Sequence, residues 1–246
     1  MTPGHLSGTD VVILCGGKGS RLRPAVNDRP KPMADIHGRP FLRILVDYFA
    51  GFGAERFVFC TGYRADAIRD YFTNRQAPLQ FVFSEEPIFL GTAGGLRHAQ
   101  RLIHSDPFLV TNGDSFCPAN LAWFYYFHTL RRALMSMIAV KSDDPVDYGS
   151  VTFDGGLRFT GFAEKGCERG PSYVNAGIYL FSRDLLALIP AGRPWSLEFD
   201  LFPKLVHGPG YVMPCNADCI DIGTPERLSA ARQYFAARTA TVGVGS

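Results

Sequence analysis

The sequence predicts a three-layer α/β/α fold with a mixed central sheet and a smaller β-rich portion in the second half of the chain. The apolar run at residues 11–14 has no polar face, which is typical of a central parallel strand covered by helices on both sides. Helical and strand patterns then alternate through the first half, which indicates right-handed βαβ units and a mostly parallel sheet. Polar motifs follow these strands, at the sheet edge where folds of this class bind ligands.

The composition favours one globular domain that acts on small molecules. The chain has 246 residues and no proline- or serine-rich linker, so we expect a single domain over residues 1–246. Its net charge is only +2 with interspersed signs, which argues against nucleic-acid binding. The N-terminus lacks the apolar core of a signal peptide, and no apolar run approaches the roughly 20 residues of a membrane span. We therefore expect a cytoplasmic protein that does not associate with membranes.

Local signals support each predicted element of the first half. Strands are predicted at residues 11–14, 56–60, 79–83 and 108–111, and helices at residues 40–49, 65–72, 91–103 and 121–132. Pro40 suits a first helical turn, and Gly51 and Gly53 end the helix that begins there. The helix at 121–132 is rich in aromatic residues, which is typical of core packing or of a surface that forms a homo-oligomer.

The second half contains more extended segments. Strands are predicted at residues 134–140, 150–153, 157–163 and 173–181, with Gly155 and Gly156 as a hairpin turn. Short helices are predicted at 184–189 and 199–206, and a final helix at 225–237 that starts with a proline. We expect residues 239–246 to form a disordered tail.

A glycine-rich, cationic turn follows the first strand. Gly16, Gly17 and Gly19 let the backbone present its N–H groups to an anion, and Lys18 and Arg21 add positive charge. A P-loop requires Gly-Lys-Ser/Thr, but Lys18 is followed by Gly19. The Gly-x-Gly-x-x-Gly dinucleotide fingerprint is also missing, and no acidic residue ends the next strand. The turn is therefore either a simple tight turn or a phosphate site of another kind.

A second motif, Arg-Pro-Lys-Pro-Met at residues 29–33, follows this turn shortly. Together with Gly-Gly-x-Gly-Ser-Arg-Leu at residues 16–22, it resembles the signature of the sugar-1-phosphate nucleotidyltransferases, and the resemblance extends over most of the chain. It implies a Rossmann-like domain in which residues 10–132 mainly bind the nucleotide and residues 133–238 mainly bind the sugar phosphate. In such enzymes a phosphate oxygen of the sugar 1-phosphate attacks the α-phosphorus of a nucleoside triphosphate, and pyrophosphate leaves.

The resemblance assigns catalytic roles to five residues. Arg21 and Lys31 are expected to neutralise the triphosphate and the departing pyrophosphate, and Lys165 is expected to bind the phosphate of the sugar. Asp114 and Asp221 are expected to hold Mg²⁺, for which one or two carboxylates suffice beside phosphates and water. The nucleophile is already an anion, so no general base is required. Asp221 has a second interpretation as a turn or cap, because the residues after it look like a helix start.

The resemblance also implies two sets of binding residues. The nucleotide is expected to contact the glycine turn, the strand ends and one helix start, namely Leu14, Gly16, Gly17, Gly19, Ser20, Arg21, Lys31, Glu85, Glu86, Gly91, Thr92, Ala93, Asn112 and Gly113. The sugar phosphate is expected to contact Tyr148, Gly149, Glu164, Lys165, Asn175 and Gly177. Amides and carboxylates suit sugar hydroxyls, because they form hydrogen bonds in fixed directions.

Two adjacent glutamates indicate which base the nucleotide carries. Glu85 and Glu86 end the third predicted strand, ahead of Gly-Thr-Ala-Gly-Gly at residues 91–95. Guanine presents two adjacent donors, N1–H and the N2 amino group, and a carboxylate can accept from both. A uracil or thymine edge would suit a glutamine amide better. The sequence therefore favours GTP, while the question of which glutamate faces the base stays open.

Among guanylyltransferases, the motifs and the length are most similar to the D-glycero-α-D-manno-heptose 1-phosphate guanylyltransferases of bacterial capsule and surface-glycan pathways. Mannose 1-phosphate is the close alternative substrate, because it differs by one carbon and pocket shape decides such a difference. Uridylyl or thymidylyl transfer is another alternative, as is a catalytically silent subunit that binds sugar nucleotides. The presence of both aspartates and of the cations Arg21, Lys31 and Lys165 argues against the silent subunit.

Overall fold

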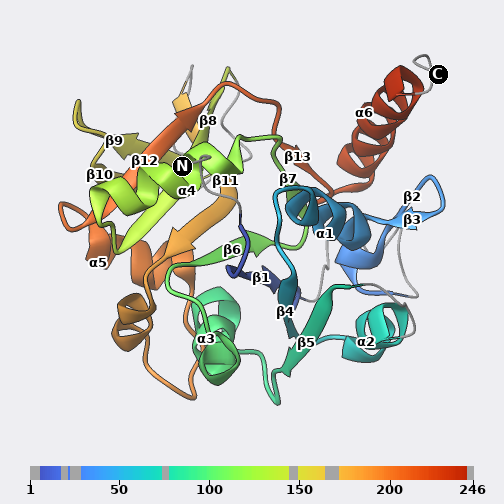
Figure 1. Cartoon of the computed structure of the whole chain (residues 1–246), viewed down its shortest axis with the longest axis horizontal. Helices are drawn as coiled ribbons and strands as arrows, with labels where there is room; N and C mark the ends of the chain where they lie inside the picture. The colour runs from blue at the N-terminus through green and yellow to red at the C-terminus, as the bar shows by residue number, and fades with distance from the viewer. Residues whose placement is uncertain are drawn as a thin grey trace.

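The computed structural model describes residues 6–17, 22, 29–73, 78–143, 149–163 and 172–242, and they form a mixed α/β fold (Figure 1). The main strands are β1 (Asp10–Leu14), β4 (Arg56–Thr61), β5 (Gln80–Glu85), β6 (Phe108–Asn112), β8 (Met135–Ser142), β9 (Ser150–Phe153), β10 (Phe159–Ala163), β11 (Ser172–Phe181) and β12 (Gly210–Cys215). They form one nine-stranded sheet, in which seven strands follow the order β10-β9-β11-β6-β1-β4-β5. β8 also pairs with β11, and β12 pairs with β8. The predicted fold class, a Rossmann-like α/β fold with a mixed central sheet, is confirmed.

The first half of the chain supplies the parallel part of this sheet. β1 lies between β4 and β6 and is parallel to both, and β5 continues the parallel order beyond β4. β11 is antiparallel to β6 and to β8, so the sheet becomes mixed where the second half of the chain joins it. The carboxyl ends of β1, β4, β5 and β6 therefore meet at one edge of the sheet.

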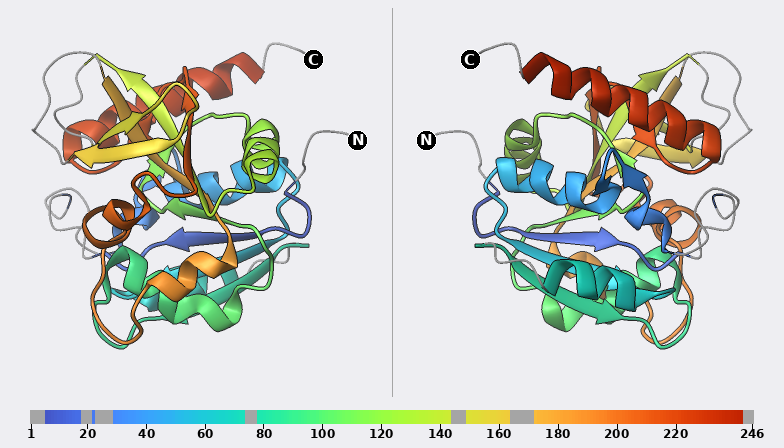
Figure 2. Two further views of the ribbon diagram at one scale, coloured as in Figure 1. Left: turned by 90° about the vertical axis from the view of Figure 1, so that its left-hand side faces the viewer. Right: turned by 90° about the vertical axis from the view of Figure 1, so that its right-hand side faces the viewer.

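Helices cover both faces of the sheet, as the apolar run of β1 predicts. The helices are α1 (Phe41–Gly51), α2 (Ala65–Thr73), α3 (Gly91–His98), α4 (Leu121–Arg131), α5 (Phe202–Leu205) and α6 (Pro225–Val242). Val11 and Ile13 belong to the core that contains buried residues of α1, α2 and α4, whereas Val12 belongs to the core that contains Leu96 of α3. Figure 2 shows α1 and α3 on opposite sides of β1. All of these β1 side chains are buried, so neither face of the strand needs polar residues.

Several element boundaries differ from the predictions. The helix expected at 91–103 ends at His98 and continues as a 3-10 helix over Ala99–Leu102, and the segment expected at 184–189 is also a 3-10 helix, Arg183–Leu188. The helix expected at 199–206 is a π-helix, η4 (Leu197–Leu201), followed by α5. The strand expected at 157–163 begins at Phe159, because Leu157 has a φ of 64° and belongs to the preceding turn. α6 continues to Val242, into the predicted tail, and residues 243–246 lie outside the described part.

The sequence did not predict β12 or four very short strands. Gly208 and Pro209 precede β12, and Pro214 lies within it, so its composition resembles a loop. β12 forms its ladder with β8 at the edge of the sheet, where proline is tolerated. The short strands form two small ladders, β2 (Asp35–Ile36) with β3 (Arg39–Pro40) and β7 (Ser115–Phe116) with β13 (Ile220–Asp221). Two-residue strands carry too little periodicity to be recognised from sequence.

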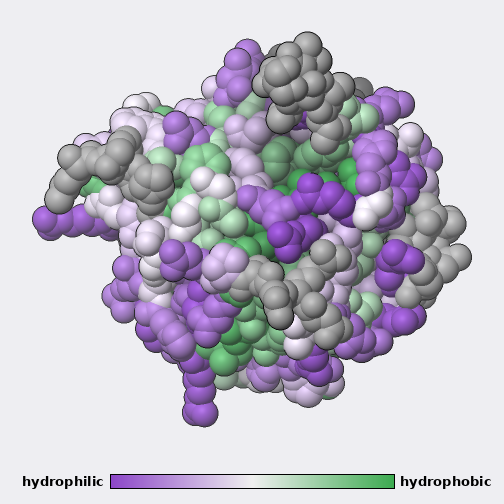
Figure 3. All heavy atoms as spheres, turned by 45° about the vertical axis from the view of Figure 1, so that its right-hand side comes forward, coloured by the Kyte–Doolittle hydropathy of each residue, from purple (hydrophilic) through white to green (hydrophobic). Residues whose placement is uncertain are grey.

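The surface combines polar side chains with apolar patches. On the face drawn in Figure 3, apolar surface appears in separate areas flanked by polar side chains. α4 exposes Trp123, Tyr126 and Leu130, while Phe124 and Phe127 of the same helix are buried, so the aromatic run serves the core in part. None of the helices in the described part of the chain combines the length and apolar character needed to cross a bilayer.

Candidate active site

A cleft of about 660 Å³ lies at the carboxyl edge of the parallel strands. Nine of the predicted binding residues line it: Leu14, Gly16, Gly17, Lys31, Glu86, Gly91, Thr92, Asn112 and Asp114. Seven other predicted residues lie outside its described lining: Glu85, Ala93, Gly113, Gly149, Asn175, Gly177 and Asp221. The remaining six, Gly19, Ser20, Arg21, Tyr148, Glu164 and Lys165, lie outside the described residues.

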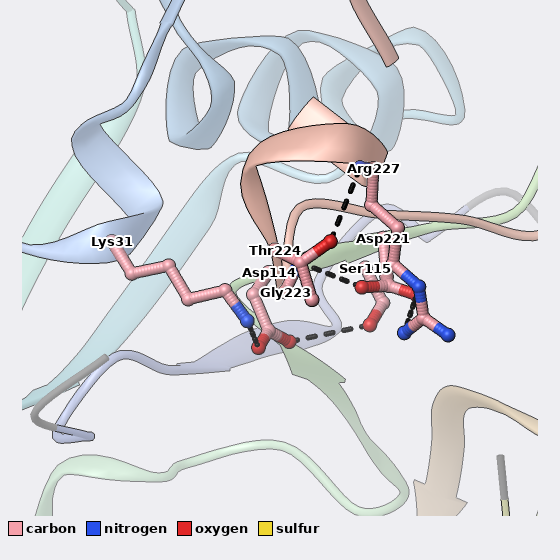
Figure 4. A network of polar contacts seen from close by, with 7 residues as sticks. All are labelled: Lys31, Asp114, Ser115, Asp221, Gly223, Thr224 and Arg227. Atoms are coloured by element: carbon pink, nitrogen blue, oxygen red, sulfur yellow. Dashed lines mark hydrogen bonds and ion pairs between the residues drawn. The ribbon is translucent and has the colours of Figure 1, made fainter. Parts of the chain in front are cut away.

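An ion pair joins the lysine motif to the end of β6 inside the cleft. Lys31 Nζ lies 2.5 Å from Asp114 Oδ2, and the Ser115 hydroxyl donates to Asp114 Oδ1 at 3.2 Å (Figure 4). Lys31 begins a 3-10 turn (Lys31–Met33) in which Pro32 and Met33 are buried, so the flanking residues anchor the backbone while the lysine side chain extends into the cleft. A cation and a partly exposed carboxylate therefore lie side by side where a polyanion can reach both.

Asp221 lies beside Asp114 on a neighbouring strand. β13 pairs with β7 so that Asp221 is opposite Ser115, and Ile222 N–H donates to the Asp114 carbonyl at 3.1 Å. The Asp221 carboxylate accepts from Gly223 N–H at 2.7 Å and from Arg227 at 2.8 Å (Figure 4). Asp221 therefore has the turn role that the sequence offered as a second interpretation, because its carboxylate closes the turn that leads into α6.

The two aspartates fit an Mg²⁺ site that the substrates would complete. In the described part of the chain, no group of three or more histidine, cysteine or acidic residues is arranged to hold a metal ion by itself. Mg²⁺ bound with phosphates usually takes only one or two protein carboxylates, and each carboxylate oxygen can accept more than one contact. Asp114 has a side chain that is 36% exposed and lines the cleft, whereas Asp221 is 11% exposed, so Asp114 is the more accessible of the two.

The structure distinguishes the two glutamates at the end of β5. Glu85 is exposed and pairs with Arg69 at 2.6 Å, on the outside of the molecule. Glu86 lines the cleft, where its Oε2 accepts from Leu90 N–H at 2.8 Å. Burial raises the pKa of Glu86, and the Leu90 hydrogen bond and the nearby His98 partly offset this rise.

Two glycines make room for the Glu86 carboxylate. A Cβ added to Gly16 would lie 2.7 Å from Glu86 Oε1, and a Cβ on Gly95 would clash with the same oxygen. Gly16 belongs to the glycine turn and Gly95 to the Gly-Thr-Ala-Gly-Gly motif. A side chain at either glycine would therefore displace the Glu86 carboxylate from its place between the two motifs, a consequence that the sequence did not reveal.

The predicted sugar ligand Asn175 is engaged inside the protein. Its Oδ1 accepts from Gly177 N–H at 3.0 Å, and its Nδ2 donates to the Tyr179 hydroxyl at 2.7 Å. Tyr179 is almost fully buried and contributes to the lining of the cleft. Burial strongly raises the pKa of Tyr179, and the charge of Glu198 adds to this effect. Tyr179 therefore remains a neutral hydroxyl that can exchange hydrogen bonds with a ligand.

Gly177 is required for the approach of this strand to Asn112. Its φ is 72°, and a Cβ there would lie 2.7 Å from Asn112 Nδ2. We predict that Gly177→Ala lowers the free energy of unfolding by about 1–3 kcal/mol. Gly155→Ala is the matched control, because a Cβ at Gly155 would meet nothing within 4 Å. Urea unfolding followed by circular dichroism measures both variants, and equal stabilities would contradict this role of Gly177.

Sequence reasoning missed one wall of the cleft, residues 194–200. Trp195, Glu198 and Phe199 line the cleft, and Phe199 is 57% exposed. The segment follows a 3-10 helix, includes the start of η4 and carries no recognisable motif. In the sequence this stretch shows only a phenylalanine between Glu198 and Asp200, and such a cluster is also common on ordinary surfaces.

Comparison with known proteins shows the family to which the chain belongs. The nucleotidyl transferase family model matches residues 10–237. This chain belongs to the nucleotidyl transferase family. The match covers all the main strands of the sheet, both aspartates beside the cleft and Lys31.

Individual nucleotidyl transferases are similar to this chain in sequence and in structure. It is 35% identical over 223 residues to a mannose-1-phosphate guanylyltransferase of Mycobacterium tuberculosis, covering 88% of this chain and 62% of the relative. It is 32% identical to a mannose-1-phosphate guanyltransferase of Pichia angusta, covering 93% of this chain and 65% of that relative. The chain therefore spans less than two thirds of the length of these two relatives. The crystal structure of HddC from Yersinia pseudotuberculosis complexed with GMP-PN has a TM-score of 0.81 and 33% identity, covering 92% of this chain and 99% of that one.

Proposed function

We propose that this nucleotidyl transferase transfers a guanylyl group from GTP to a sugar 1-phosphate, D-glycero-α-D-manno-heptose 1-phosphate, and releases pyrophosphate. The observation that carries the proposal is that one cleft holds Glu86 together with the Lys31–Asp114 pair. The names of the relatives support guanylyl transfer, and so does the crystal structure of HddC in complex with GMP-PN. The product would be a GDP-sugar for the synthesis of a capsule or another surface glycan.

Glu86 is the proposed reader of the base. Its Oε2 accepts from Leu90 N–H, which fixes the carboxylate against the backbone, and its Oε1 lies between Gly16 and Gly95. A carboxylate held in this way can accept from guanine N1–H and N2–H, because each oxygen has more than one lone pair. The position of Glu85 supports this choice, since Glu85 lies outside the described lining and pairs with Arg69.

The protein's contribution to the reaction is charge and orientation. Lys31 would bind the triphosphate and disperse the charge that develops on the departing pyrophosphate. Asp114 and Asp221 would hold Mg²⁺, which supplies charge neutralisation for the phosphates when it is bound. Arg21 and Lys165 are proposed as further phosphate ligands, although both lie outside the described residues. Bringing two polyanions together is the main obstacle in such a reaction, and these groups lower it; no general base is required, because the attacking phosphate oxygen is already an anion.

Mannose 1-phosphate is the second candidate acceptor. The names of the M. tuberculosis and P. angusta relatives favour it, whereas the sequence motifs favour the heptose. Tyr179, Glu198 and Phe199 form the wall that would meet the sugar, and they offer hydroxyl, carboxylate and aromatic contacts. The two sugars differ by one carbon, which is worth only about 1–3 kcal/mol in a pocket.

A coupled assay of pyrophosphate release tests the proposed activity. We expect release from GTP only when a sugar 1-phosphate and Mg²⁺ are both present, and we expect a chelator to abolish it. GTP alone and the sugar phosphate alone serve as controls. Binding of a GDP-sugar without any release of pyrophosphate would instead support the catalytically silent subunit.

A further inference from the structure

Two distant segments of the chain are hydrogen-bonded to each other at one wall of the cleft. Ala93 and Gly94, at the start of α3, donate their N–H groups to the Trp195 carbonyl at 2.9 and 3.0 Å. In return, Trp195 N–H donates to the Leu90 carbonyl at 2.8 Å. Leu197 N–H donates to the Thr92 hydroxyl at 2.8 Å. The turn that follows Glu86 is thus attached to the segment that carries Glu198 and Phe199.

Glycines allow the two backbones to approach this closely. Gly91 has a φ of 71°, and a Cβ there would lie 2.6 Å from the Trp195 carbonyl oxygen. A Cβ on Gly94 would lie 2.9 Å from the Arg193 carbonyl oxygen. Since the amides of Ala93 and Gly94 are already bonded to Trp195, this part of the glycine motif serves a contact within the protein.

The segment held in this way has its own internal order. The Ser196 hydroxyl accepts from Glu198 N–H at 3.1 Å and from Phe199 N–H at 3.3 Å, and Ser196 N–H donates to Asp200 at 2.7 Å. Residues 196–200 therefore behave as one unit, and displacement of Leu197 would displace Glu198 and Phe199. Of the four hydrogen bonds between the segments, the one to Thr92 is the only one that uses a side chain, so it can be removed by substitution.

From these contacts we infer that Thr92, expected from the sequence to contact the nucleotide, is instead a positioning residue: its hydroxyl holds the 195–200 segment in place and so sets the sugar side of the cleft. The expected change in KM rests on the proposed function, whereas the expected movement of the segment rests on the geometry alone. The hydroxyl accepts the Leu197 N–H, and Leu197 precedes Glu198, whose charge acts on the Tyr179 hydroxyl. Glu86 is anchored by Leu90 N–H, and this hydrogen bond does not use the Thr92 hydroxyl, so we expect loss of that hydroxyl to leave the base contact in place.

Substitution of Thr92 combined with tryptophan fluorescence tests this role. The chain has two tryptophans, Trp123 and Trp195, so Trp123→Phe leaves Trp195 as the reporter of the segment. In that background we expect Thr92→Val to increase quenching of Trp195 by acrylamide in the ligand-free protein. The KM for the sugar 1-phosphate should rise about five- to tenfold while the KM for GTP changes less than about twofold. Thr92→Ser, which keeps the hydroxyl, should restore both values. Thr129→Val removes a hydroxyl from the exposed surface of α4 and should change neither.

The fluorescence result separates this inference from the proposed function. If no sugar phosphate is turned over by the unmodified protein, the proposed function fails, and the quenching of Trp195 still decides whether Thr92 holds the segment. Unchanged quenching in Thr92→Val would overturn the inference. An equal rise in KM for GTP and for the sugar phosphate would overturn it as well, because the role predicted for Thr92 is confined to the sugar side.

Discussion

Asp114→Asn is expected to lower the turnover number by about a hundredfold to a thousandfold, the range seen when one charge-stabilising group is removed from an active site. Asparagine has nearly the same size, its one carbonyl oxygen can still accept from Lys31, and its NH₂ group can donate to the Ser115 hydroxyl, so the fold should be retained. What is lost is the negative charge, which balances Lys31 at 2.5 Å and is proposed to hold Mg²⁺. Steady-state pyrophosphate release at saturating substrates measures the effect.

Two further variants locate the cause of this loss. Asp66→Asn is the matched control, because Asp66 lies on the exposed surface of α2, and it should retain full activity. Lys31→Met removes the other member of the ion pair and should raise the KM for GTP without changing the Mg²⁺ concentration that gives half-maximal rate. Asp114→Asn should increase that Mg²⁺ concentration. Near-normal activity of Asp114→Asn with an unchanged Mg²⁺ requirement would rule out the proposed role of Asp114.

Glu86→Gln is expected to reduce kcat/KM for GTP by about ten- to a hundredfold, which corresponds to a mismatch of about 1–3 kcal/mol. The amide keeps one oxygen, which can still accept from Leu90 N–H, and turns an NH₂ group toward the guanine donors. UTP and dTTP should lose less or gain, because their edges offer acceptors beside one donor.

Glu85→Gln provides the control for the base-reading role. Glu85 carries the same side chain one residue earlier, but it is exposed and bonded to Arg69, so its substitution should leave kcat/KM for GTP within about twofold. Equal losses for all nucleotides in Glu86→Gln would show that this residue supports the cleft without reading the base. An effect of Glu85→Gln as large as that of Glu86→Gln would contradict the assignment of one glutamate to the cleft.

The parallel half of the fold could be predicted because its signals are local. The apolar run of β1, the proline at the start of α1 and the glycines after it are each explained by the element in which they lie. β12 could not be predicted, because its place in the sheet is set by pairing with β8, more than 60 residues earlier in the chain. The pairing of β7 with β13, which brings Asp221 beside Asp114, likewise depends on contacts between distant segments.

The residues of the cleft could be predicted where they belong to charged or glycine-rich motifs. They could not be predicted where tertiary packing determines which side chains face the cleft. The sequence indicated Lys31, Asp114 and the pair Glu85–Glu86, but only the fold shows that Glu86 faces inward and Glu85 outward. The contact between Asn175 and the sugar stays a prediction, and only the fold shows that its amide is bonded to Gly177 and Tyr179. The wall at 194–200 could not be found, because its position depends on backbone contacts with α3 that leave no pattern in the sequence.

The most direct measurement of the central claim is a matrix of GTP, ATP, UTP and dTTP against the 1-phosphates of heptose, mannose, glucose and N-acetylglucosamine. Each pair would be scored by pyrophosphate release and by mass spectrometry of the sugar nucleotide. We predict the highest kcat/KM for GTP with the manno-configured heptose 1-phosphate, and mannose 1-phosphate as the next acceptor. Preference for UTP or dTTP, or the absence of any sugar nucleotide in every mixture, would contradict guanylyl transfer to a manno-configured sugar.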